Sequence, residues 1–138
     1  MTGTYVHSID AKGRIFIPAR LRDELGAEFY VTLSLGKCLA AYPLSSWAKF
    51  EEKYNERTRP EKNRLRPFFS NASKCELDSM GRILLPQVLR DMVGLKKNVT
   101  VVGVGDIAEF WDSDEWTETN NNETTPENIE AVLMELGI

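Results

Sequence analysis

The chain has 138 residues, 42% of them apolar, so it can bury a core in one domain or two small ones. No apolar run is long enough to span a membrane, and residues 1–14 lack the basic leader and apolar core of a signal peptide, so we expect a cytoplasmic protein. The net charge of −4 argues against nucleic-acid binding only if the distribution of charge along the chain is ignored. Residues 1–105 hold all 17 basic and 11 acidic side chains (+6), whereas residues 106–138 hold ten acidic and no basic ones (−10).

After a predicted strand at residues 4–9, the chain enters a segment that occurs twice. Residues 9–26 read IDAKGRIFIPARLRDELG, and residues 77–94 read LDSMGRILLPQVLRDMVG. Nine of the eighteen positions are identical, and most of the others pair one apolar residue with another. A repeat of this density over a whole supersecondary unit indicates an internal duplication.

Each copy begins with a tight turn of the pattern D-x-x-G-R. In the first copy, the Asp10 side chain can accept hydrogen bonds from backbone N–H groups, and Gly13 can adopt the positive φ that closes the turn. Arg14 leaves the turn beside Asp10, so the carboxylate can brace the guanidinium. The second copy has the same three residues as Asp78, Gly81 and Arg82.

The turn leads into a predicted strand at residues 14–17 and a short helix at residues 18–25. Pro18 suits the first helical position, and Gly26 suits a left-handed C-terminal cap.

Each half then continues with two predicted strands and a helix. In the first half these are residues 27–35, 38–42 and 47–57, with Ser45 or Ser46 as the N-cap of the helix. In the second half they are residues 98–104, residues 108–111 and a short helix around Trp116 that Ser113 can cap.

The most basic stretch, residues 54–74, includes the segment 55–72 that connects the two halves. Pro60 and Pro67 bound a possible helix within it. Its basic side chains either form a solvated helix face or attract an acidic partner, which would be a neighbouring subunit or the phosphates of DNA.

Beyond Trp116, the polar residues 117–125 (TETNNNETT) predict a flexible linker, and Thr125 followed by Pro126 predicts the start of a C-terminal helix. Its apolar stripe consists of Ile129, Val132, Leu133 and Leu136. An isolated helix this short is marginal in water, so the stripe must dock on the body, a neighbouring subunit or another protein. We favour docking on the basic residues 57–66. Deleting residues 119–138 should then alter assembly or DNA affinity.

The duplicated plan predicts an α+β fold. Two β-α-β-β repeats related by a pseudo-two-fold axis would close one small β-barrel-like unit with flanking helices, because a single half has too little core to stand alone. The expected organisation is a first repeat with its following helix, a basic connecting segment, a second repeat, and an acidic linker with an amphipathic helix. Their ranges are 1–54, 55–72, 73–117 and 118–138.

The chain offers no catalytic constellation. His7 is the only histidine, which excludes a His-based acid–base pair and a multi-His metal site. Cys38 and Cys75 are expected to be buried reduced thiols. Asp10 and Asp78 each precede an arginine by four residues, which indicates salt bridges and not a catalytic carboxylate pair. We therefore predict no enzyme activity, no metal and no cofactor.

Paired D-x-x-x-R turns, each running through a short apolar strand into P-x-x-L-R, resemble the MraZ family of bacterial transcriptional regulators, which carry two SpoVT-AbrB modules in one chain. The resemblance covers residues 1–117 and includes YPL at residues 42–44, RPFFS at residues 66–70 and VVGVG at residues 101–105. It implies a sequence-specific DNA-binding repressor of the division and cell-wall gene cluster. Such a protein forms a ring-shaped homo-oligomer on the nucleoid and binds short direct repeats in its own promoter region. No small-molecule effector is evident.

The resemblance assigns the face of the two turns to double-stranded DNA, including Gly13 and Gly81. A guanidinium held by a carboxylate suits bidentate pairing with guanine or phosphate, which makes Arg14 and Arg82 the principal candidates. Purely structural salt bridges at these two arginines are the alternative.

Two further basic residues, Lys12 and Arg20, are candidates for phosphate contacts. Their counterparts in the second copy are Met80 and Val88, so we expect the first half to carry more of the phosphate-contacting charge. Arg22 and Arg90 also recur, but they are equally consistent with structural helix residues.

A second function also fits the sequence. SpoVT-AbrB-like modules occur in antitoxins, where an extension binds a toxin, and the C-terminal helix would be such an extension. An antitoxin normally carries one module per chain, however, and this chain has two.

Overall fold

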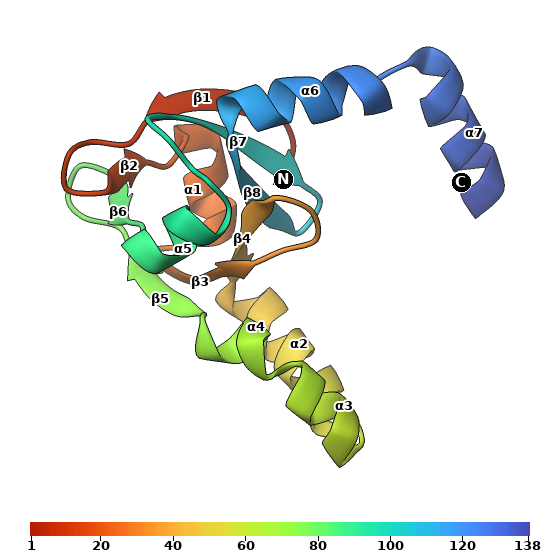
Figure 1. Cartoon of the computed structure of the whole chain (residues 1–138), viewed down its shortest axis with the longest axis horizontal. Helices are drawn as coiled ribbons and strands as arrows, with labels where there is room; N and C mark the ends of the chain where they lie inside the picture. The colour runs from red at the N-terminus through yellow and green to blue at the C-terminus, as the bar shows by residue number, and fades with distance from the viewer.

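The computed structural model describes residues 1–138 and contains eight strands and seven helices (Figure 1). The first half consists of β1 (Thr4–Ser8), β2 (Arg14–Phe16), α1 (Ala19–Leu25), β3 (Glu28–Leu33), β4 (Cys38–Pro43) and α2 (Leu44–Asn55). Two short helices connect the halves, α3 (Arg59–Arg64) and α4 (Arg66–Ser70). The second half consists of β5 (Ser73–Glu76), β6 (Arg82–Leu84), α5 (Gln87–Met92), β7 (Asn98–Val104), β8 (Ile107–Asp112) and α6 (Ser113–Glu123), and α7 (Pro126–Leu136) follows.

The first strand of each repeat pairs with a strand of the other repeat, β1 with β7 and β5 with β3. The large sheet has the order β1-β7-β8-β4-β3-β5, and every neighbouring pair is antiparallel. The order is equivalent when it is read from either end, as a pseudo-two-fold axis requires. Neither half can complete its sheet alone. This exchange confirms the predicted α+β fold of two repeats in one barrel-like unit and excludes two independent domains.

The core lies between the large sheet and a separate two-stranded ladder of β2 and β6. Ile15 and Ile83 pair at the centre of this ladder and are buried. Leu21 of α1 and Leu89 of α5 occupy equivalent buried positions in the same cluster. Because side chains alternate along a strand, burial of the central isoleucines turns the flanking residues of β2 and β6 outward.

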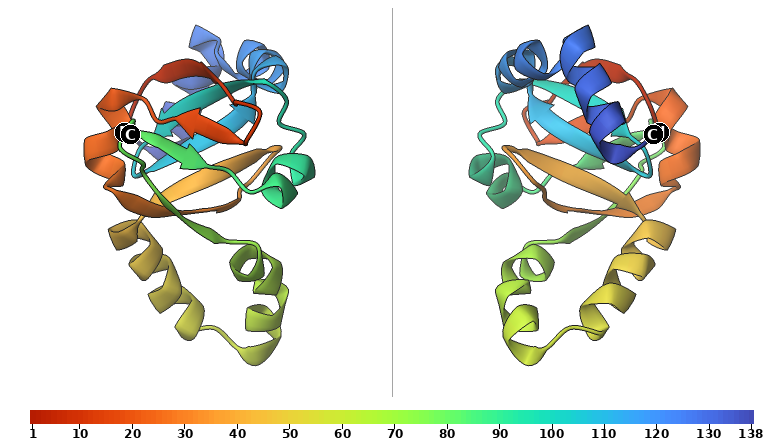
Figure 2. Two further views of the ribbon diagram at one scale, coloured as in Figure 1. Left: turned by 90° about the vertical axis from the view of Figure 1, so that its left-hand side faces the viewer. Right: turned by 90° about the vertical axis from the view of Figure 1, so that its right-hand side faces the viewer.

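The segment between the halves forms a helical arm of α2, α3 and α4 that projects from the barrel (Figure 2). Stacked aromatic rings hold it together. Trp47 stacks on Tyr30 of β3 with ring centroids 4.5 Å apart, and Phe50 stacks on Phe68 at 4.4 Å. At the equivalent position in the second half, the aromatic cluster is reduced to one pair, Trp111 with Trp116.

Several helix ends differ from the sequence predictions. The helix expected at residues 47–57 begins earlier, because Pro43 is its N-cap and no serine side chain caps it. Pro18 is likewise an N-cap and not the first helical residue. In both cases the proline has an extended conformation, and the helix begins at the next residue. Gly26 has the expected positive φ of 83°, but its ψ of 178° is extended and not left-handed helical.

The helix predicted between Pro60 and Pro67 is α3, which ends at Arg64, and a second helix that was not predicted, α4, begins at Arg66 after a break at Leu65. Pro67 lacks the N–H group that would continue the hydrogen bonding of α3, so the chain must turn before it. Thr58 and Glu61 form a capping box at the start of α3.

The prediction of a flexible linker at residues 117–125 is wrong. Helix α6 continues to Glu123, so only Thr124 and Thr125 separate α6 from α7. The first turns of α6 are anchored on the sheet, because Trp116 packs against Trp111 and the hydroxyl groups of Thr100 and Ser113 lie 2.9 Å apart. Once a helix is anchored, each further residue adds a hydrogen bond at a small cost in entropy, even where the composition is polar.

Helix α7 begins as predicted, with the Thr125 hydroxyl accepting a hydrogen bond from the backbone N–H of Asn128 at 3.1 Å. Its apolar stripe remains exposed. Ile129 is 47% exposed, and Val132 and Leu133 are 42% and 43% exposed. The helical arm lies on a different side of the barrel (Figures 1 and 2), so the favoured docking of α7 on residues 57–66 does not occur within one chain.

Cys38 and Cys75 are buried and unpaired, which confirms the prediction of buried reduced thiols. Burial raises the pKa of the Cys38 thiol to about 12 and that of the Cys75 thiol to about 11, so both are protonated at neutral pH. None of the helices combines the length and the hydropathy needed to cross a bilayer.

Candidate nucleic-acid interface

The two D-x-x-G-R turns share one pattern of hydrogen bonds. In the first turn, Oδ1 of Asp10 accepts bonds from the backbone N–H groups of Lys12 at 3.0 Å and Arg14 at 2.9 Å. Oδ2 of Asp10 accepts a third bond from Nε of Arg14 at 2.8 Å. Asp78 holds Arg82 in the same way, with Nε of Arg82 at 2.9 Å. Each arginine is therefore tied at its backbone and at Nε to one carboxylate.

These bonds fix the charge state of both carboxylates. The bond from the backbone N–H of Arg14 is the largest cause that lowers the pKa of Asp10 below its ordinary value of 3.8. The bond from the backbone N–H of Arg82 lowers the pKa of Asp78 in the same way. Both carboxylates are thus ionised at neutral pH, and each can orient a guanidinium.

The β2–β6 ladder sets the two arginines on one outward face. Arg14 and Arg82 each precede a buried isoleucine of the ladder by one residue, so their side chains point away from the core. The ladder is antiparallel, and Arg82 lies opposite Phe16 while Arg14 lies opposite Leu84. The two guanidinium groups therefore lie on either side of the pseudo-two-fold axis.

The two arginines are not equivalent. Nη1 of Arg82 lies 4.0 Å from the Asp10 carboxylate, and its guanidinium lies 5.8 Å from the centre of the Phe16 ring. The Arg82 side chain is 18% exposed, whereas that of Arg14 is 35% exposed. The difference follows from the sequence, because Leu84 in the second repeat stands where Phe16 stands in the first. Arg14 is the more available of the two to a ligand.

Gly13 and Gly81, which we predicted to contact DNA, are buried in the structure of the single chain. Arg22 of α1 covers Gly81, and Arg90 of α5 covers Gly13. A Cβ added to Gly81 would come within 2.3 Å of Cζ of Arg22, and one added to Gly13 would come within 2.8 Å of Nη2 of Arg90. The glycines leave room for these guanidinium groups.

Arg22 and Arg90 therefore have a structural role in this fold. Nε of Arg22 donates to the carbonyl of Ile17 at 2.8 Å while its guanidinium lies over Gly81 of the other repeat. Arg90 mirrors this arrangement over the first turn, with its Nε donating to the carbonyl of Leu85 at 3.0 Å. The signal in the sequence was the joint recurrence of glycine and arginine, but it did not identify which residues meet.

Lys12 and Arg20 are exposed and form no ion pair. Lys12 belongs to the first turn, beside Arg14. Arg20 lies on the first turn of α1 and makes no hydrogen bond to either D-x-x-G-R turn. The structure thus groups Lys12, Arg14 and Arg82 around the ladder and places Arg20 on the adjoining helix. The counterparts Met80 and Val88 are exposed apolar residues.

This arrangement favours recognition of anions and base edges. Guanidinium groups with one edge held by a carboxylate present their remaining N–H groups in a fixed direction. The structure contains no group of three or more His, Cys, Asp or Glu side chains that could hold a metal ion.

Comparisons with known proteins point to one family. A family model described as "MraZ protein, putative antitoxin-like" matches residues 1–66 and residues 68–132. The Transcriptional regulator MraZ of Moorella thermoacetica is 48% identical over 119 residues, which cover 84% of this chain and 83% of that protein. The protein of the same name from Halothermothrix orenii is 41% identical over 140 residues, which cover 99% of this chain and 98% of that protein.

A solution structure from Pyrococcus horikoshii also shows some likeness, with a TM-score of 0.34 and 16% identity. The match covers 78% of this chain and 84% of that one. It is too distant to bear on function.

Proposed function

The chain belongs to the MraZ family of transcriptional regulators, and from this premise we propose how it acts on DNA. It binds short direct repeats in its own promoter region as a ring-shaped homo-oligomer and represses the division and cell-wall gene cluster. The observation that carries the proposal is the pair of carboxylate-braced arginines, Arg14 and Arg82, on one outward face of the β2–β6 ladder.

The bracing favours base recognition. A guanidinium already held by Asp10 or Asp78 has little rotamer freedom left to lose when it binds. Its free N–H groups fit the O6 and N7 atoms of guanine, or two phosphate oxygens. The carboxylate of its own turn binds each arginine through Nε alone, and the only other acidic contact is the Asp10 carboxylate 4.0 Å from Nη1 of Arg82. A structural salt bridge and a DNA contact are therefore compatible in the same side chain.

The surrounding charge supports a phosphate backbone as the partner. Lys12 and Arg20 are exposed and unpaired, and both belong to the first repeat. Basic side chains of this kind position a protein on the duplex without reading sequence. The uncharged counterparts Met80 and Val88 make the first repeat the main phosphate contact.

Self-assembly accounts for affinity and for the form of the DNA site. Two arginines supply few base contacts per subunit, so several linked subunits on several sites are needed for tight binding. Subunits arranged head to tail around a ring present the same face in the same sense. Their successive DNA sites are then direct repeats and not palindromes.

The test is DNA binding by the wild type and by Arg14→Ala/Arg82→Ala, with a duplex from its own upstream region and a scrambled duplex. Each lost bidentate contact costs about 1–3 kcal/mol of discrimination, so preference for the specific duplex should fall at least about tenfold. Wild-type affinity should also fall steeply with salt, because phosphate contacts release counterions. The variant should still assemble.

Lys49→Ala/Arg59→Ala is the matched control, because it removes the same charge from the helical arm. It should keep the preference for the specific duplex. The proposal is wrong if both double variants discriminate equally well, or if the wild type does not prefer its own upstream region.

The proposed partners are double-stranded DNA and further copies of the chain, and the proposed location is the cytoplasm, on the nucleoid. No effector is part of the mechanism. The exposed stripe of α7 is the observation that favours the antitoxin-type alternative. That alternative predicts that the chain shows no preference for its own promoter duplex and that it binds an unrelated protein through α7.

A further inference from the structure

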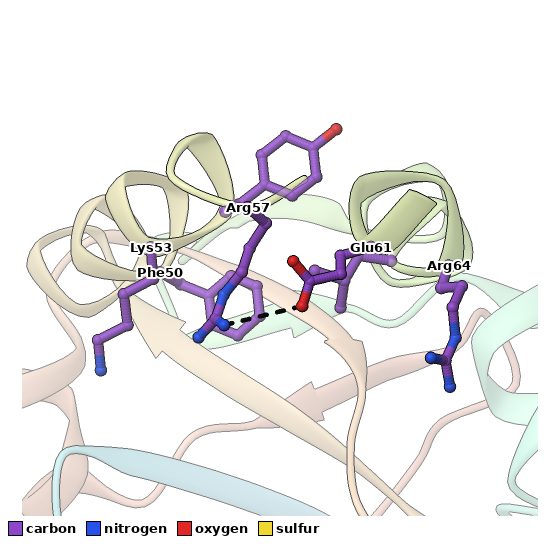
Figure 3. Close-up of a pocket in the computed structure, with 7 residues that line it drawn as sticks. Phe50, Lys53, Arg57, Glu61 and Arg64 are labelled. Atoms are coloured by element: carbon purple, nitrogen blue, oxygen red, sulfur yellow. Dashed lines mark ion pairs between the residues drawn. The ribbon is translucent and has the colours of Figure 1, made fainter. Parts of the chain in front are cut away.

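A groove lies between α2 and α3 in the helical arm (Figure 3). It is a cavity of about 480 Å³, and its apolar lining consists of Phe50, Tyr54 and Leu65. Lys53 reaches it from α2, Arg57 from the turn that follows α2, and Arg64 from α3 on the other side. Glu61 is the one acidic residue of the lining, and it lies 3.9 Å from Arg57. The groove is therefore apolar inside, basic on both sides and positive in net charge.

The apolar surface continues past this groove. Phe50 and Leu65 also line a second cavity of about 520 Å³, which reaches Leu33 and Ile107 of the barrel. Because the two cavities share Phe50 and Leu65, their apolar linings form one continuous surface, which suits the apolar face of a helix.

Helix α7 has the opposite character. Its apolar stripe is exposed, as described above, and residues 106–138 contain no basic side chain. At 100° per residue, Glu130 lies about 60° from Leu133 on one edge of the stripe, and Glu135 lies about 60° from Val132 on the other edge. The stripe is thus flanked by carboxylates on both sides, as the groove is flanked by basic groups on both sides.

The chain cannot bring these two surfaces together by itself. Only Thr124 and Thr125 separate α7 from α6, and α6 is anchored on the sheet by Trp116. In Figures 1 and 2, α7 and the arm lie on different sides of the barrel. A groove and a complementary helix on different sides of one molecule can only meet between copies.

We propose that α7 of one subunit occupies the groove between α2 and α3 of a neighbouring subunit. The proposal rests on the self-assembly proposed above and names the contact that produces it. Glu130 and Glu135 face Lys53, Arg57 and Arg64 across the groove, and the apolar stripe covers Phe50 and Leu65. The contact is head to tail, so every subunit of a closed ring gives one helix and receives one.

The first test uses two variants that each lack one side of the contact. Deletion of residues 124–138 leaves the groove but no α7, and Lys53→Glu/Arg64→Glu leaves α7 but reverses the charge of the groove. In sedimentation without DNA, self-association of each variant should be weakened at least about tenfold relative to the wild type. An equimolar mixture of the two should form a one-to-one complex, because one variant supplies the groove and the other supplies the helix.

Two further variants control for charge. Lys49→Glu/Arg59→Glu makes the same change in charge on α2 and α3 outside the groove, and it should assemble like the wild type. Adding Glu130→Lys/Glu135→Lys to the groove variant restores opposite charges across the contact and should restore assembly.

The outcomes separate this inference from the proposed function. If the deletion variant assembles as well as the wild type and still binds the promoter, the inference is wrong and the proposed function stands. If deletion abolishes assembly but groove reversal does not, α7 binds another surface of the neighbouring subunit, such as its α7, and the inference is again wrong. A wild type that remains monomeric would overturn both this contact and the proposed ring, whereas Arg14→Ala/Arg82→Ala tests DNA contact alone.

Discussion

Gly81 shows that the D-x-x-G-R turn is a packing site as well as a turn. Its φ is +82°, and an added Cβ would lie 2.3 Å from Cζ of Arg22. Gly81→Ala should therefore lower the free energy of unfolding by about 1–3 kcal/mol, from backbone strain and from displacement of the Arg22 guanidinium. Urea unfolding measures this change.

Gly94→Ala is the matched control for that prediction. Gly94 also has a positive φ of +66°, but no atom lies within 4 Å of an added Cβ. Gly94→Ala should lower the free energy of unfolding by less than Gly81→Ala, because it introduces backbone strain without displacing a side chain. Equal losses for the two variants would show that the Arg22–Gly81 contact contributes nothing to stability.

The sequence predicts one of these arginine contacts and misses the other, for a physical reason. Asp10 and Arg14 lie four residues apart in one turn, so local geometry alone brings them together. Arg22 and Gly81 belong to different repeats, and they meet only because β2 pairs with β6. A duplication shows which residues are equivalent, but it does not show which residues are neighbours.

At the scale of elements, the helical arm depends on Trp47. Its side chain is 6% exposed, and its ring stacks on Tyr30 at 4.5 Å and on Phe68 at 5.6 Å. Trp47→Ala should cost about 3 kcal/mol or more, because it empties the centre of the aromatic cluster. Hydrogen exchange should accelerate mainly in α2, α3 and α4.

Trp116→Ala is the comparison for the arm. Trp116 occupies the equivalent position in the second half and packs against Trp111. Its loss should accelerate exchange in α6 and leave α3 protected. Faster exchange in α3 in both variants would mean that the arm is not an independently held element.

The elements that composition predicts poorly are those fixed by contacts distant in sequence. Residues 117–125 look like a linker because they are polar, yet most of them are helical because Trp116 anchors α6 on the sheet. Pro43 turns directly from β4 into α2, so the serines that resemble an N-cap are not used. The amphipathic pattern of α7, by contrast, is local and was predicted correctly.

At the scale of the whole molecule, strand exchange makes the halves interdependent. β1 pairs with β7 and β5 pairs with β3, so each half leaves an unpaired edge and a missing strand when it is alone. Residues 1–72 and 73–138 expressed separately should be unfolded by circular dichroism. Mixed from denaturant, they should refold into a one-to-one complex. Cooperative unfolding of either half alone would contradict this account.

The duplication in the sequence was sufficient to predict a pseudo-two-fold barrel, but not the order of its strands. That order depends on hydrogen bonds between strands far apart in the chain, such as Thr4 opposite Val102 and Glu28 opposite Glu76. No local pattern specifies such a pairing. The pairing of β2 with β6, which also joins the two repeats, aligns the two turns on one face, so the candidate site is a property of the complete molecule.

The most direct test of the central claim, that the braced arginines read DNA, is the specificity of Arg14→Lys/Arg82→Lys. Lysine keeps the positive charge but loses the planar, bidentate geometry and the Nε bond to the carboxylate. The measurement is the ratio of dissociation constants for a scrambled duplex and the promoter duplex. We predict that this ratio falls at least about tenfold while non-specific affinity and its salt dependence remain. An unchanged ratio would contradict the account and leave both arginines as structural residues of the turns.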